Sequence, residues 1–319
     1  DLTLGGRTDA AGHIAYTAMD HTEAGMDGSL AAVLTEQDPL AGINSLARQV
    51  AASGIRRVRG EVIVDDRLFE TSRAGYGYLR TPIVVNDNLM DFVITPTLPG
   101  TPAHVDWRPR TAAYQVEAQV MTVAATEAPQ IALSAPEPGR ILVKGRMPAG
   151  EKPSIRVWRV EDPASFARTL LMEALQRAGV AVDASPLGKN PSAKLPPRGA
   201  LASLPQVALL TSPPYAETVK LISKVSHNLG ADLTPLLIAA NRGRRSFEEG
   251  MALMGAFLKR IGVDVQSISL ADGQGGERSN QVTPLSVVQL LRYMATRPDF
   301  EAYYNSQPIL GVDGTLAHT

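Results

Sequence analysis

The 319-residue chain contains no cysteine, and this absence removes several kinds of chemistry at once. Without a thiol there is no disulfide bond, thiolate metal site, iron–sulfur cluster or cysteine nucleophile. Neither sign of charge is in excess, because 31 basic side chains stand against 32 acidic ones and the formal net charge is −1. Such a balance lacks the positive field of an electrostatic nucleic-acid binder, so we expect no nucleic-acid partner.

Long apolar runs are also missing. No stretch reaches the roughly 18 uninterrupted apolar residues that a membrane-spanning helix needs, so we expect no transmembrane segment. Residues 1–20 lack the basic start and apolar middle of a signal peptide. With 44% hydrophobic and 20% charged residues, the composition is that of an ordinary soluble globular protein. The length favours two or three domains with hydrophobic cores.

Several common functional motifs do not occur. The five histidines form no His-Glu-x-x-His pair, and there is no Gly-x-Ser-x-Gly nucleophile elbow. The glycine-rich run 273–276 completes neither a Gly-x-Gly-x-x-Gly nor a Walker lysine motif. We interpret the arginine-rich run 241–245 as a loop between helices. A polar cluster near the start is interpreted as a solvated loop; it contains His13, Asp20, His21, Glu23 and Asp27.

The first part of the chain predicts one helix followed by one strand. Apolar side chains fall at helical spacing within residues 29–53, and Gly54 stands where a glycine commonly ends a helix. The run from Glu61 to Val64 then predicts a strand.

The middle of the chain changes to short β-rich runs separated by proline and glycine turns, from residue 92 to 160. Asp162 and Pro163 then predict a helix start, and Gly179 its end, before a short strand at 180–182. The β-rich segment therefore interrupts an α/β domain.

The proline-rich segment 185–205 is the best linker in the sequence, and a domain boundary is expected near Leu204. Three helices are predicted after it. They cover residues 214–225, a segment from 246 to 261 with Ser246 and Glu249 as a capping box, and a segment opened by Thr283 and Pro284 that runs to 294.

Ser226 and Asn228 form a Ser-x-Asn triplet at the end of the first of these helices. Taken alone, a serine and an asparagine at a helix end are usually caps. Order and context favour a functional interpretation. Residues 272–284 read Asp-Gly-Gln-Gly-Gly-Glu-Arg-Ser-Asn-Gln-Val-Thr-Pro, and residues 311–316 read Gly-Val-Asp-Gly-Thr-Leu.

In this order the three segments resemble the class C penicillin-binding proteins, the D-alanyl-D-alanine carboxypeptidase and endopeptidase family. That family has a Ser-Asp-Asn-like triplet, an Asp-Gly-Ser-Gly-Leu-Ser-Arg-x-Asn-x-Val-Thr-Pro segment and a Gly-x-x-Gly-Thr-Leu turn. The resemblance extends over nearly the whole chain, because residues 1–9, 54–66, 85–88 and 144–148 are similar to further family segments.

The resemblance implies a multi-domain α/β fold in three parts. Residues 1–88 and 161–205 would form an α/β accessory domain, and residues 89–160 an all-β insert. Residues 206–319 would be the C-terminal part of a β-lactamase/transpeptidase-like serine acyltransferase domain, in which helices cover an antiparallel sheet.

The resemblance also implies an activity and its site. The parent enzyme would hydrolyse the D-Ala-D-Ala bond of peptidoglycan stem peptides through an acyl-serine, with no metal or other cofactor. β-Lactams would inhibit it, and it would work in the periplasm or at the extracellular cell wall. The Ser226 hydroxyl would relay a proton to the leaving amine, and the Asn228 amide would hold the peptide carbonyl. Arg278 would bind a substrate carboxylate; the alternative is a surface arginine in a turn.

Two of the three family motifs are missing, since no Ser-x-x-Lys and no Lys-Thr-Gly occurs in the chain. The family order puts the first before this chain's opening segment and the second after its Gly-Thr-Leu turn, so we expect both outside residues 1–319 and the chain as given to be inactive. The alternative is a non-catalytic wall-binding or scaffold protein that keeps the fold.

Three local departures from the family pattern concern the substrate side of the site. Glu277 stands next to Arg278 and is expected to neutralise it. The segment 72–78 is short and contains no acidic residue. Residue 227 is histidine where the family usually has aspartate or asparagine, and its role is left open.

Overall fold

The computed structural model describes residues 21, 24, 34, 38–75 and 77–317. The chain forms two compact units. Among the described residues, unit 1 holds those up to 65 together with 84–212, and unit 2 holds 66–83 and 213–317. Residues 66–83, which the sequence analysis assigned to the accessory domain, thus group with the C-terminal residues. The limits of the three predicted domains stay predictions, and residues 1–9 lie outside the described residues.

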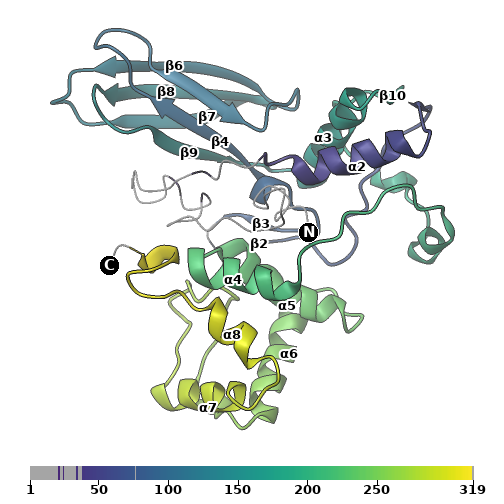
Figure 1. Ribbon diagram of the computed structural model, residues 1–319, viewed down its shortest axis with the longest axis vertical. Helices are drawn as coiled ribbons and strands as arrows, with labels where there is room; N and C mark the ends of the chain where they lie inside the picture. The colour runs from purple at the N-terminus through teal and green to yellow at the C-terminus, as the bar shows by residue number, and fades with distance from the viewer. Residues whose placement is uncertain (1–20, 22–23, 25–33, 35–37, 76, 318–319) are drawn as a thin grey trace. The chain divides into compact units, whose positions relative to one another are not determined.

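Both helices predicted for unit 1 are confirmed. Helix α2 covers Ala41–Ala52, and Gly54 follows it at a φ of +93°, a left-handed conformation that glycine adopts without strain. Helix α3 covers Pro163–Arg177, and the Asp162 side chain caps it by accepting a hydrogen bond from the backbone N–H of Ser165. The two helices lie side by side (Figure 1).

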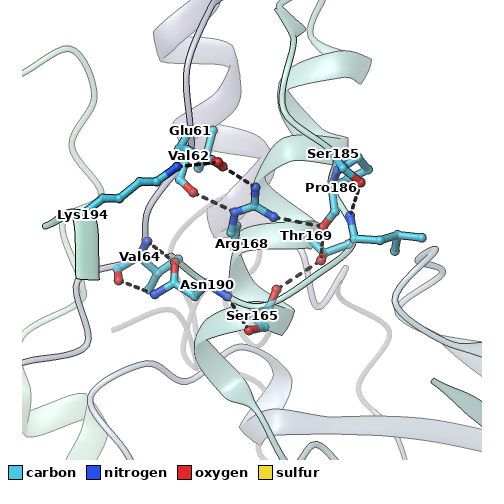
Figure 2. Close-up of polar contacts among 11 residues, drawn as sticks. Glu61, Val62, Val64, Ser165, Arg168, Thr169, Ser185, Pro186, Asn190 and Lys194 are labelled. Atoms are coloured by element: carbon cyan, nitrogen blue, oxygen red, sulfur yellow. Dashed lines mark hydrogen bonds and ion pairs between the residues drawn. The ribbon is translucent and has the colours of Figure 1, made fainter. Parts of the chain in front are cut away.

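The strand predicted at 61–64 is wrong, although this segment is extended. The parallel pair in this region is instead β1 (Arg57–Val58) with β10 (Ala181–Val182). Side chains replace a neighbouring strand along 61–64, as Figure 2 shows. The amide of Asn190 donates to the carbonyl of Val64 at 2.8 Å and accepts from its N–H at 2.9 Å. A strand partner would offer the same pair of bonds, but periodicity cannot show which group supplies them.

The β-rich runs are confirmed as strands and form two three-stranded sheets (Figure 1). In the first, β4 (Leu89–Thr95) pairs antiparallel with β5 (His104–Arg108) and β9 (Ser154–Arg159). In the second, β8 (Arg140–Pro148) pairs parallel with β6 (Gln115–Val123) and antiparallel with β7 (Gln130–Glu137). Fully buried apolar side chains on the central strands form the core here; they include Phe92, Ile94, Ile141, Val143 and Met147.

His21 is not part of a solvated loop, since it is only 6% exposed. Its Nδ1 lies 2.8 Å from Asp91 Oδ1, and its Nε2 lies 2.7 Å from Asp87 Oδ2. Burial opposes ionisation of Asp91, but His21, Arg108 and Asn86 together hold the pKa of its carboxyl below the ordinary value. Sequence order could not predict this, because the two carboxylates come from a distant part of the chain. The other four members of the polar cluster lie outside the described residues.

In the described part of unit 2 the named strands are those of the hairpin β2 (Ser72–Arg73) and β3 (Leu79–Arg80), and the other named elements are helices. The three predicted helices are confirmed as α4 (Tyr215–Val225), α6 (Phe247–Arg260) and α7 (Pro284–Met294). Two helices were not predicted: α5 (Asn228–Ala240) and α8 (Phe300–Ser306). The remaining helical elements of the described chain are short 3-10 turns: η2 (Asn86–Asn88), η3 (Ser192–Lys194), η4 (Arg198–Ser203), η5 (Val265–Ser267) and η6 (Gly314–Leu316).

Helix α5 was not predicted because it contains Gly230 and Pro235, two residues that normally weaken or break helices. Packing against α6 stabilises it. A Cβ at Gly250 of α6 would overlap the carbonyl of Pro235, so the two backbones approach as closely as only glycine permits. Phe69, Leu236 and Phe247 form the buried cluster beside this contact.

Among the described helices, none combines the length and the apolar character of a membrane-spanning segment.

Candidate active site

The Ser-x-Asn triplet forms the junction between α4 and α5. Ser226 ends α4 in the left-handed conformation, with φ 60° and ψ 46°, and Asn228 is the first residue of α5. A left-handed residue other than glycine costs about 1–2 kcal/mol. Such strain persists only where the surrounding structure enforces it, and it is common at functional sites.

The side chains of the triplet differ in exposure. Ser226 is exposed, and within the described part of the chain its hydroxyl makes no hydrogen bond. His227 is buried, with 4% of its surface exposed, and Asn228 is half-buried. The N-cap residue of α5, His227, makes no side-chain capping hydrogen bond. Ser226 therefore does not act as a side-chain cap here, and its hydroxyl remains available to a ligand.

The segment 272–280 packs on the first turns of α5. The backbone N–H of Gly273 donates to Asp232 Oδ1 at 2.8 Å, and a Cβ at Gly273 would lie 2.5 Å from the carbonyl oxygen of Ala231. Pro235 has no N–H to donate to that carbonyl, which leaves the α5 surface open for this approach. Gly273, the first glycine of the segment, therefore allows the backbone to pack directly against α5.

Asp272 holds the segment in shape. It is 4% exposed, and its carboxylate accepts hydrogen bonds from the N–H of Gly275 at 2.6 Å, the N–H of Glu277 at 2.9 Å and the amide of Asn280 at 2.9 Å. The Asn280 side chain in turn accepts from the N–H of Ala271 at 2.8 Å. Asp272 and Asn280 are therefore the residues whose side chains close the turn of this segment.

Asp232 also joins the segment to the β2–β3 hairpin. The carboxylate is fully buried, and its Oδ2 accepts from the Tyr78 hydroxyl at 2.6 Å and from the Arg80 Nη2 at 2.9 Å. Burial raises the pKa of the Tyr78 hydroxyl, and the hydrogen bond to Asp232 raises it further. The guanidinium of Arg80 lies over the Phe247 ring, 3.8 Å from its centroid. One carboxylate thus neutralises a buried arginine and fixes two loops.

The Gly-Thr-Leu turn packs on the last turn of α4, two residues before Ser226. Lys224, 6% exposed, donates from Nζ to Asp313 Oδ2 at 2.6 Å and to the carbonyl of Gln307 at 2.8 Å. The hydrogen bond from Lys224 lowers the pKa of the Asp313 carboxyl. Gly314 has a φ of +60°, and a Cβ there would overlap the Lys224 carbonyl. The turn therefore requires glycine at this position for both conformation and space.

Arg278 is exposed, as a substrate-facing residue or a surface arginine would be. The expected neutralisation by Glu277 is not seen: within the described residues no carboxylate lies within ion-pair distance of Arg278. Glu277 instead points at Gly75, where a Cβ would overlap its Oε1. The acid-free segment 72–78 thus contacts a carboxylate supplied by the neighbouring loop.

Four residues that support the site were not predicted from the sequence: Tyr78, Arg80, Lys224 and Asp232. One signal was present for Asp232, an acidic residue among the apolar side chains Leu229, Leu233 and Leu236 of one helix. An acid in such a stretch is rarely buried without a partner. The partner itself could not be read from the sequence, because Tyr78 and Arg80 precede it by about 150 residues. Among the described residues no group of His, Asp and Glu side chains has the arrangement of a metal site.

The chain has a mixed α/β fold, and comparison with known protein families identifies the family to which it belongs. The chain belongs to the D-Ala-D-Ala carboxypeptidase 3 (S13) family, whose model matches residues 23–319.

Two curated proteins are similar to the chain over most of its length. A D-alanyl-D-alanine carboxypeptidase of Actinomadura sp. (strain R39) is 29% identical over 303 residues, which is 86% of this chain and 55% of that protein. The D-alanyl-D-alanine carboxypeptidase DacB of Haemophilus influenzae is 26% identical over 315 residues, 92% of this chain and 63% of that protein. The chain thus spans 55% to 63% of the length of these relatives.

Solved structures support the same fold. Penicillin binding protein 4 (dacB) from Haemophilus influenzae has a TM-score of 0.66 at 22% identity, over 86% of this chain and 62% of that one. A structure of the same protein complexed with a β-lactam has a TM-score of 0.63 at 24% identity, over 86% of this chain and 60% of that one.

Proposed function

We propose that the chain is part of a class C penicillin-binding protein, a serine-type D-Ala-D-Ala carboxypeptidase or endopeptidase of peptidoglycan stem peptides. The observation that carries the proposal is the ordered set of three family-like segments: the first forms the α4–α5 junction, and the other two each contact one of the two helices that meet there. Segment 272–280 packs on the first turns of α5. The Gly-Thr-Leu turn contacts α4 at Lys224, two residues before Ser226, whose side chain is exposed. Membership of the S13 family supports this assignment. A periplasmic or cell-wall location is part of the proposal.

The roles of the two junction residues follow from the needs of acyl transfer. A serine nucleophile and its lysine, proposed to lie outside residues 1–319, would form the acyl-serine. The Ser226 hydroxyl, exposed and held by a strained backbone, would pass a proton toward the leaving amine. The Asn228 amide, fixed at the first residue of α5, would hold the carbonyl of the acyl donor. The site as proposed uses no metal and no other cofactor.

The domain layout remains part of the proposal. Residues 206–319 would belong to a transpeptidase-like domain in which helices cover an antiparallel sheet. The accessory domain of 1–88 and 161–205, without the residues 66–83 that group with the C-terminal residues, and the all-β insert of 89–160 would be separate from it.

The 319-residue chain is expected to form no covalent adduct with labelled penicillin, because it contains no Ser-x-x-Lys. A longer protein that includes that motif is expected to form one adduct per molecule, measured by intact-protein mass spectrometry. Changing the motif serine of the longer protein to alanine is the control and should abolish the adduct.

The same experiment separates the alternative function. The missing Ser-x-x-Lys is also the observation that favours a non-catalytic wall-binding or scaffold protein. A stoichiometric adduct on the 319-residue chain would contradict our interpretation of the motifs. A longer protein that is folded yet never acylated would favour the scaffold.

Arg278→Ala in the longer enzyme is expected to raise KM for stem peptides that bear a side-chain carboxylate by roughly tenfold or more. A charge-assisted contact is worth about 1.5–3 kcal/mol, and only these substrates would lose one. A small acyl-D-Ala-D-Ala substrate should keep its KM.

Glu277→Gln is the matched control, because the Glu277 side chain lies against Gly75 and forms no ion pair with Arg278. It should leave KM for both substrates nearly unchanged. Equal losses on both substrates in Arg278→Ala would mean that the arginine only maintains the turn.

A further inference from the structure

Unit 1 contains a cavity of about 490 Å³, and none of its lining residues belongs to the Ser226 junction. It lies where the start of β6 and the β7–β8 turn meet the first turns of α3. Its volume is within the range of about 300–1,000 Å³ that ligand sites occupy. The residues that matter for its chemistry are Tyr114, Gln115, Glu137, Arg140, Phe166 and Leu187.

The wall beside α3 is held by hydrogen bonds that Figure 2 shows. Thr169 Oγ1 donates to the carbonyl of Pro186 at 2.7 Å, and Arg168 Nη1 donates to the same oxygen at 3.3 Å. The N–H of Leu187 donates to Ser185 Oγ at 3.3 Å. These hydrogen bonds therefore attach the loop that carries Leu187 to α3.

The opposite wall is fixed as well. Glu173 of α3 accepts hydrogen bonds at Oε1 from the N–H of Ala112 at 2.7 Å and from the Thr111 hydroxyl at 3.1 Å. These bonds hold the segment that leads into β6 and carries Tyr114. Both sides of the cavity are thus positioned by the same helix.

Tyr114 supplies the aromatic surface and an unused hydroxyl. Its ring packs on Phe166 with 6.1 Å between centroids and an angle of 55°. Within the described part of the chain its hydroxyl makes no hydrogen bond, and neither does the side-chain amide of the exposed Gln115. Burial, with Glu161 and Asp162 nearby, raises the pKa of Tyr114 to about 12, so the hydroxyl stays a donor at neutral pH.

Most of the charge around the cavity is already engaged. Asp162 accepts from both the N–H and the hydroxyl of Ser165 at the start of α3. Arg140 forms an ion pair with Glu117. Glu137 remains as an exposed carboxylate that can accept hydrogen bonds from hydroxyl groups. The groups left for a ligand are an aromatic ring, a phenol, an amide, one carboxylate and the N–H groups of Arg140 that do not face Glu117.

This set of groups fits a sugar ring better than an ion. The apolar face of a pyranose can pack on an aromatic ring, while its vicinal hydroxyls donate to a carboxylate and exchange hydrogen bonds with an amide and a phenol. We propose that the cavity of unit 1 binds a neutral saccharide, with Tyr114 and Gln115 as its main contacts. This assigns a ligand to a region that takes no part in the proposed acyl transfer.

The test is a calorimetric titration of the 319-residue chain with the tetramer of N-acetylglucosamine. Binding in the micromolar to millimolar range is expected. Tyr114→Phe keeps the ring and its packing on Phe166 but removes the hydroxyl, and Gln115→Ala removes the amide. Each should weaken binding by about two- to tenfold, the effect of losing one net hydrogen bond.

Gln130→Ala is the matched control. Gln130 is an exposed glutamine on β7 of the same sheet that does not line the cavity, so this variant should bind like the unchanged protein. No binding of the tetramer, or binding that neither Tyr114→Phe nor Gln115→Ala weakens, would overturn the proposal. None of these results depends on penicillin acylation, so failure here and failure of the proposed function are distinguishable.

Discussion

Replacing Asn228 by alanine is expected to slow acylation of the proposed full enzyme, by a β-lactam or a stem peptide, by about a hundredfold or more. Loss of one positioned donor at a reacting carbonyl has an effect of this size. The amide belongs to the first residue of α5, two residues after the left-handed Ser226, so the backbone of the junction fixes the point from which this side chain extends. The rate constant of acylation, measured by stopped-flow with a chromogenic β-lactam, reports the effect directly.

Asn241→Ala is the matched control, since Asn241 is exposed at the other end of the same helix. Its acylation rate should match that of the unchanged enzyme. Both variants should unfold at the same urea concentration as the parent, which separates a chemical effect from a loss of structure. Equal acylation rates for the two variants would show that Asn228 does not take part in the reaction.

Asp232→Ala is expected to lower the free energy of unfolding by about 3–5 kcal/mol. Removal of one partner of a buried ion pair leaves the other charge buried without compensation, and this penalty has that size. Here the uncompensated charge would be Arg80, 7% exposed, and the Tyr78 hydroxyl and the Gly273 N–H would lose their acceptor as well. Urea denaturation of the 319-residue chain, followed by circular dichroism, measures the change.

Asp299→Ala provides the comparison on the surface. Asp299 pairs with Arg297 at 3.3 Å, and its side chain is 66% exposed. An exposed pair contributes about 0–1 kcal/mol, so this variant should be nearly as stable as the parent. If the two aspartate variants lost the same stability, Asp232 would not be the residue that joins the hairpin, α5 and the Gly-rich segment.

Helix ends with local signals were predictable from the sequence. The capping box of Ser246 and Glu249 forms as expected, with the Glu249 N–H 3.1 Å from Ser246 Oγ and the Ser246 N–H 3.1 Å from Glu249 Oε2. Asp162 with Pro163 starts α3, and Gly54 follows α2 at a positive φ. These features involve residues within about one helical turn of one another, so the chain order contains them.

Features that depend on distant partners were not predictable. Helix α5 forms despite Pro235 because α6 packs against it at Gly250. Residues 61–64 form no strand because the side chain of Asn190, 126 residues away from Val64, takes the place of a neighbouring strand. His21 is buried because Asp87 and Asp91 meet it from 66 and 70 residues further along the chain.

The sequence by itself determined the order of the family-like segments and the identity of the residues in them, including Ser226, Asn228 and Arg278, because identity and spacing are properties of the chain. Only the tertiary structure decided how those segments are supported. Asp232 and Lys224 pair with groups about 150 and 89 residues away, and glycines at 273 and 314 allow the two loops to approach α5 and α4. These contacts are set by burial and close packing, and the cost of an unpaired buried charge selects them over any local alternative.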